Sequence, residues 1–140
     1  MQNQYYSDSE VENLVRDFES CKAHPSAFNH RAHLTTAVWY LTRLPFAEAH
    51  ERLRTNLQRF LQHHKIEGYN ETVTLFWLRL VNERIGEAKH DGCAYEIANR
   101  VIESLGCSQI IYDYYTKERL ASEEARGGWI EPDVKPLECD

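Results

Sequence analysis

Apolar residues recur at intervals of three and four positions along most of this sequence, and this period places side chains on one face of an α-helix. The clearest stretch runs from Ala94 to Leu105 and ends at the helix-stopping Gly106. Six glycines and four prolines in 140 residues favour long helices over many short strands and turns. We therefore expect an all-α fold: a single-domain bundle of five to six helices over residues 1–140, with an extended tail at about 127–140.

Capping residues indicate where the expected helices begin. Ser7 with Glu10 three positions later is a capping-box pattern. Asn29 and Asn70 are good N-cap residues, and Pro45 suits the first turn of a helix. The expected helices cover residues 7–20, 29–43, 45–61, 71–88, 91–105 and 108–120, with one short helical turn at 122–126.

Three further expectations concern the packing of the helices, the start of the fifth helix and the tail. The helix at 71–88, which contains Phe76 and Trp77, is apolar on two sides, and this is typical of the central helix of a bundle. Asp91 is a candidate cap for the helix that follows it. In the tail, Trp129 is expected to hold the chain against the bundle, because an indole gains free energy when it is buried.

Charge and composition limit the partners of this chain. The formal net charge of −6 argues against nucleic acid and against an anionic membrane surface, and the basic run at 52–65 is interpreted as a solvated helix face. No apolar run approaches the ~20 residues of a membrane-spanning helix, and no signal peptide is visible at the start. We expect a cytoplasmic protein whose four cysteines are reduced thiols: Cys21, Cys93, Cys107 and Cys139.

The most informative segment is FNHRAHL at 28–34, at the start of the second expected helix. His30 and His33 lie about 60° apart around a helix axis, so both point toward the core from the first turn. Two neutral imidazoles on one face can share a metal ion or a polar ligand. A helix start also exposes backbone N–H groups, which favour a nearby anionic group.

A second segment, GYNETVT at 68–74, places Glu71 in the first turn of the fourth expected helix. If the two helix starts meet, His30, His33 and Glu71 make a two-histidine, one-carboxylate set, which suits zinc or iron(II) with open positions. Tyr69, Asn70 and Thr74 would then contact the ligand or orient the metal-binding groups. By contrast, His50 falls within the apolar stripe of its own helix and is interpreted as a core or edge histidine.

These segments, together with YYTKERLASEEARGGWIEPD at 114–133, resemble a family of small bacterial helical proteins without a settled function. The family pattern is aromatic-x-His-x-x-His-Leu followed by Gly-Tyr-His-Glu-Thr-x-Thr, and the resemblance covers residues 28–136. It marks as site residues the matching positions His30, His33, Tyr69, Glu71, Thr72 and Thr74. The sequence departs at Asn70, where the pattern has a histidine. An amide there would weaken a metal site but would serve equally well as a helix cap.

Three functions are consistent with these residues. The first is a metal-assisted enzyme acting on a small molecule, in which His30, His33 and Glu71 hold one divalent ion (zinc, iron or nickel) and a bound water does the chemistry. The second is a non-enzymatic module that binds a small molecule or a partner through the same groups without metal. In the third, the polar cluster is architectural and fixes the register of the helices.

Overall fold

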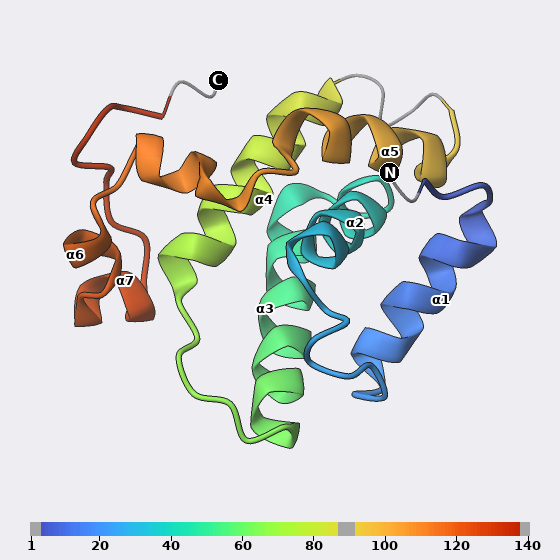
Figure 1. Cartoon of the computed structure of the whole chain (residues 1–140), viewed down its shortest axis with the longest axis horizontal. Coiled ribbons are helices and arrows are strands. Elements are labelled where there is room, and N and C mark those ends of the chain that lie inside the picture. Colours follow the sequence, from blue (N-terminus) through green and yellow to red (C-terminus); the bar gives the residue numbers. More distant parts are fainter. Residues whose placement is uncertain (1–3, 87–91, 138–140) are drawn as a thin grey trace.

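The computed structural model describes residues 4–86 and 92–137, and every regular element in these ranges is a helix. Five long helices are followed by three short ones (Figure 1). The elements are α1 (Asp8–Glu19), α2 (His30–Leu41), α3 (Phe46–His63), α4 (Glu71–Ile85), α5 (Ala94–Leu105), the 3-10 helix η2 (Ser108–Asp113), α6 (Lys117–Leu120) and α7 (Glu123–Gly127). The prediction of an all-α bundle is confirmed. None of the helices in this part of the chain is long and apolar enough to cross a membrane.

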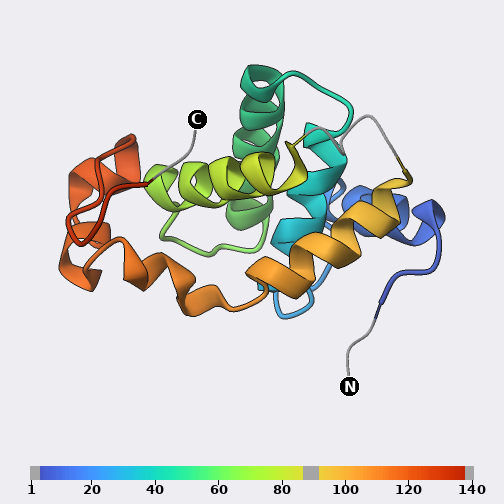
Figure 2. The ribbon, with the colours of Figure 1, turned by 90° about the horizontal axis from the view of Figure 1, so that it is seen from above.

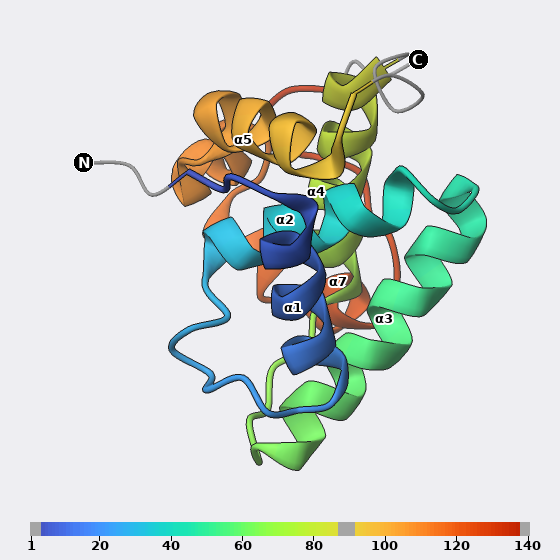
Figure 3. The same cartoon turned by 90° about the vertical axis from the view of Figure 1, so that its right-hand side faces the viewer.

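The helix at the centre of the bundle is α2, which packs against α1, α3, α4 and α5 (Figure 3). Eight of its twelve residues are buried, and two of these are Thr35 and Thr36. Each threonine hydroxyl donates to the carbonyl four residues earlier at 2.9 Å. Because these hydroxyls are satisfied within their own helix, α2 can occupy a position that its sequence alone does not indicate. The helix at 71–88, for which the sequence predicts a central place, is α4, and it also packs against four helices: α2, α3, α5 and α7.

Helix starts agree closely with the capping residues. Ser7 and Glu10 form the predicted capping box at the start of α1. Asn29 and Asn70 are the N-caps of α2 and α4, and each side-chain oxygen accepts the N–H three residues further along at 3.0 Å. These caps place the first turns of α2 and α4, and therefore the candidate site residues on them.

Other boundaries differ from the sequence-based expectation. Pro45 has an extended backbone and is the N-cap of α3, not a residue of its first turn. Helix α4 ends at Ile85, earlier than expected, because Gly86 adopts a positive φ of 55° that no helical residue has. Ala88 and Asp91, which enter the predicted limits of these helices, lie outside the described residues.

The stretch at 108–120 is not the single helix that its sequence suggests. It divides into η2 and α6, and Thr116 begins α6 by accepting the N–H of Arg119 at 3.2 Å. The hydroxyl of Thr116 also donates to Asp133 at 2.7 Å, and its N–H donates to the same carboxylate at 2.9 Å. Asp133 in the tail thus accepts hydrogen bonds from the Thr116 N–H and hydroxyl. In a continuous helix this N–H would bond to a carbonyl of the same helix, and the difference accounts for the break.

The C-terminal elements gather beside α4, at the opposite end of the molecule from α1 (Figure 2). Thr72 of α4 joins them to the bundle: its hydroxyl donates to the carbonyl of Gly128 at 2.5 Å and accepts the N–H of Ile130 at 3.2 Å. The guanidinium of Arg79 lies 4.2 Å from the ring centre of Trp129. Trp129 is therefore half-buried against α4, in agreement with its expected role in holding the tail.

Candidate ligand-binding site

A cavity of about 390 Å³ lies between α2, α3 and α4, next to the starts of α2 and α4. Its walls are mainly apolar, and they include Phe28, Leu34, Leu53, Leu57, Val73 and Trp77. The polar residues that line it are Asn29, His30, His33, Tyr69, Asn70 and Thr74. The two helix starts predicted to form a site therefore do meet, and five of the six predicted site residues line one cavity.

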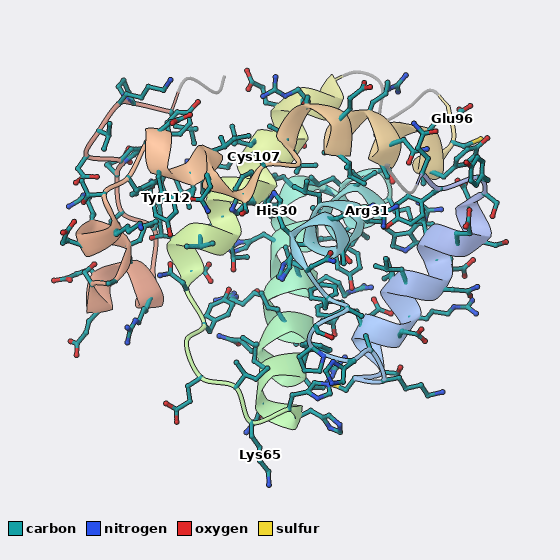
Figure 4. The ribbon with its side chains drawn as sticks, in the orientation of Figure 1. His30, Arg31, Lys65, Glu96, Cys107 and Tyr112 are labelled. Atoms are coloured by element: carbon teal, nitrogen blue, oxygen red, sulfur yellow. The ribbon has the colours of Figure 1, made fainter. Side chains whose placement is uncertain are left out.

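His30 lies on the α4 side of α2, whereas its neighbour Arg31 extends toward α1 (Figure 4). The His30 ring contacts the Trp77 indole edge-to-face, with the ring centres 4.4 Å apart. Its Nε2 is 3.0 Å from the carbonyl oxygen of Leu105, at the end of α5. A carbonyl only accepts, so Nε2 carries the proton and, in the neutral ring, Nδ1 is left as an acceptor.

His33 lies one turn deeper along α2 and is the most strongly perturbed histidine of the site. Its ring packs against Phe28 with the ring centres 4.3 Å apart. Burial, followed by the nearby charge of His30, lowers the pKa of His33 from its ordinary value of 6.5 to about 4. In the described part of the chain neither of its ring nitrogens has a hydrogen-bond partner. His33 therefore presents a neutral, unpaired imidazole to the cavity at neutral pH.

Glu71 is the predicted site residue that does not line the cavity. Its Oε2 lies 2.6 Å from Nε2 of His50 on α3, and its Oε1 accepts the hydroxyl of Tyr69 at 2.6 Å. The Glu71 and His50 side chains are only 9% and 20% exposed. Burial and the bond to Glu71 raise the pKa of Tyr69 well above its ordinary value, so this phenol stays protonated. Tyr69 lines the cavity, and its hydroxyl donates to Glu71, which does not line it.

His50 is the residue that sequence reasoning misses. The apolar stripe of α3 includes it, and this signal indicates a core or edge position but does not identify a partner. Only the packing of α3 against α4 brings its ring to a carboxylate on the first turn of α4. A histidine within an apolar stripe was the available signal, since a buried imidazole needs a hydrogen-bond partner.

Asn70 and Thr74 line the cavity, but their polar groups are already paired. The Asn70 amide accepts the Val73 N–H and donates to the carbonyl of Leu120 at 2.7 Å. The Thr74 hydroxyl donates to the backbone carbonyl of Asn70 at 3.0 Å. Asn70 is thus a helix cap that also joins α4 to α6, which explains the asparagine without any metal-binding role.

Replacing Asn70 by alanine is expected to lower the free energy of unfolding by about 1–2 kcal/mol, because both the cap and the bond to Leu120 are lost. Chemical denaturation measures this loss. Asn29→Ala is the matched control, since Asn29 caps α2 with a single bond of the same length. Equal losses in the two variants would show that the bond to Leu120 contributes nothing.

A metal held by His30, His33 and Glu71 does not fit this arrangement. Both oxygens of Glu71 are taken by His50 and Tyr69, and Nε2 of His30 is taken by a carbonyl. Within residues 4–86 and 92–137, no three His, Cys, Asp or Glu side chains are placed to hold one ion. Zinc, iron or nickel binding stays a prediction from sequence, and we derive no chemistry from it.

Comparisons with protein-family models, with curated proteins and with solved structures find no match to this chain. The resemblance to small bacterial helical proteins accordingly stays a prediction. The function is therefore inferred from the chemistry of the cavity itself, in which apolar walls surround two imidazoles whose polar atoms are not all paired.

Proposed function

We propose that this chain is a small-molecule-binding domain whose ligand occupies the cavity between α2, α3 and α4. The observation that carries the proposal is the unpaired imidazole of His33 in a cavity with apolar walls. His33 is partly buried, and a ligand that pairs with its imidazole while covering the apolar walls would form a hydrogen bond that no described residue supplies. By contrast, His50 is bonded within the protein, to Glu71.

The size and lining of the cavity support a compact, largely apolar ligand. Its volume of about 390 Å³ falls within the range of known small-molecule sites, which runs from about 300 to 1,000 Å³. Aromatic walls from Phe28, Tyr69 and Trp77 offer ring faces for stacking. Each 100 Å² of apolar ligand surface removed from water would contribute roughly 2.5 kcal/mol before the entropic cost of association.

Filling the cavity tests the proposal. Ala37 of α2 lines it and is 3% exposed, so Ala37→Phe places a ring where the ligand would lie. Ala47→Phe on the exposed face of α3 adds the same side chain outside the cavity. A library of small aromatic and aliphatic compounds is screened by protein-detected NMR. We expect hits whose shifts map to residues lining the cavity and whose affinity falls by at least about tenfold in Ala37→Phe but not in Ala47→Phe.

Two outcomes of this screen contradict the proposal. One is the absence of any compound that shifts the signals of the cavity residues. The other is binding that Ala37→Phe leaves unchanged, since the bound site would then lie elsewhere. Repeating the titrations after exhaustive treatment with a chelator separates this function from a metal-assisted one, because the binding proposed here is expected to survive the loss of divalent ions.

A further inference from the structure

The polar groups of the cavity differ in whether they are available to a ligand. Asn29 and Asn70 are engaged as helix caps, Thr74 bonds a backbone carbonyl, and Tyr69 bonds Glu71. The polar atoms that stay available to a ligand are imidazole nitrogens, namely both ring nitrogens of His33 and Nδ1 of His30. A neutral imidazole offers one acceptor and at most one donor.

The residues that line the cavity also limit the charge of its ligand. None of the described residues that line the cavity is Asp, Glu, Lys or Arg. An ionised ligand group would lose its hydration without gaining a counter-ion, and this loss is large in apolar surroundings. Protonation of His33 to match an anion is also opposed, because its pKa is lowered to about 4.

Two features that attract ions elsewhere are neutralised here. The starts of α2 and α4 would favour an anion, but asparagine side chains already cap both of them. The carboxylate of Glu71 would favour a cation, but Glu71 does not line the cavity and both of its oxygens are bonded. Neither an anionic nor a cationic ligand has a counter-ion in the lining.

We propose that the ligand of this cavity is an uncharged, largely apolar molecule with one hydroxyl group, which donates a hydrogen bond to the unpaired imidazole of His33. This inference rests on the proposed function and names the chemical class of its ligand. The hydroxyl pairs with the His33 acceptor, while the aromatic and aliphatic walls contact the rest of the molecule. Alcohols and phenols meet both conditions.

Four naphthalene derivatives of similar size test this class by isothermal titration at pH 7.5. They are 2-naphthol, 2-methoxynaphthalene, 2-naphthoate and 2-naphthylmethylammonium, which differ in having a donor, no donor, a negative charge or a positive charge. We expect 2-naphthol to bind about tenfold more tightly than 2-methoxynaphthalene, the effect of one buried hydrogen bond, and both ions to bind more weakly still.

Variants of His33 test whether this residue causes the preference for 2-naphthol over 2-methoxynaphthalene. In His33→Leu the advantage of 2-naphthol over 2-methoxynaphthalene is expected to fall to about one, whereas in His33→Gln, which retains an acceptor, part of it should remain. If His33→Leu does not fold, the shift of the His33 ring nitrogens on adding 2-naphthol to the wild-type protein gives the same assignment.

The possible failures are distinguishable. Equal or tighter binding of 2-methoxynaphthalene or of either ion would overturn the hydroxyl proposal and leave the proposed function standing. If the compound screen finds cavity ligands but none of the four derivatives binds, the hydroxyl proposal is again overturned. Failure of the screen and of all four derivatives overturns both.

Discussion

Acidification from pH 6.5 to pH 4 is expected to remove about 3 kcal/mol of stability through His33 alone. The pKa of this residue is 6.5 in its ordinary state and about 4 in the fold, and each unit of difference corresponds to about 1.4 kcal/mol. Between these values the unfolded chain holds a proton that the folded chain does not. The free energy of unfolding therefore falls as the pH falls through this window, and the contribution of His33 is constant above it.

The measurement is denaturant unfolding at several pH values, for the wild-type protein and for His33→Gln. Gln does not titrate and keeps a polar side chain, so the carboxylates and the other histidines contribute equally to both curves. The difference between the two curves is expected to change by about 3 kcal/mol between pH 6.5 and 4. A difference that stays constant would show that His33 is not shielded from water.

Replacing Glu71 by leucine is expected to destabilise the fold by about 2–4 kcal/mol. The substitution removes the partner of two side chains at once, the His50 ring and the Tyr69 hydroxyl, each bonded to Glu71 at 2.6 Å. The Glu71 side chain is only 9% exposed, so little water reaches this position. Water therefore does not fully replace the hydrogen bonds that the His50 ring and the Tyr69 hydroxyl lose. Thermal and chemical denaturation at pH 7 measure the loss.

A triple variant distinguishes two causes of this loss of stability: unpaired hydrogen-bonding groups and a changed side-chain shape. In Glu71→Leu/His50→Leu/Tyr69→Phe all three polar groups are gone, and no donor is left unpaired. Replacing a whole buried network by apolar side chains is much less costly than removing one member, so the triple variant should recover most of the stability. If it is no more stable than the single variant, the loss arises from shape and not from unpaired groups.

The cavity and the His50–Glu71–Tyr69 network share only Tyr69, and this has a consequence for experiments. Tyr69 belongs to both, with its ring in the cavity wall and its hydroxyl on Glu71. A substitution of Glu71 that alters ligand binding would act through the position of the Tyr69 ring. His33 has no such link, so His33 and Glu71 variants distinguish direct contact with a ligand from support of the wall.

Much of the helical architecture can be read from the sequence because it depends on local interactions. The period of apolar residues and the capping side chains of Ser7, Asn29 and Asn70 act within a few positions, and all three caps are found where they are expected. The same locality explains why His30 and His33 could be placed on one face of α2. It also explains the failure at 108–120, where Asp133, distant in sequence, supplies the bonds that divide the helix.

The sequence by itself determined the all-α class, the starts of α1, α2 and α4, and the polar residues at two helix starts that are candidates for a site. That these two helix starts meet was decided by the tertiary structure. Only the tertiary structure decided which polar groups are paired. In the folded chain Glu71 is bonded to His50 and Tyr69, and Asn70 is bonded to Leu120 of α6. His33 has no hydrogen-bond partner among the described residues and lines a mainly apolar cavity. The physical reason is that helix periodicity fixes the direction of a side chain, whereas its hydrogen-bond partner depends on how separate helices pack.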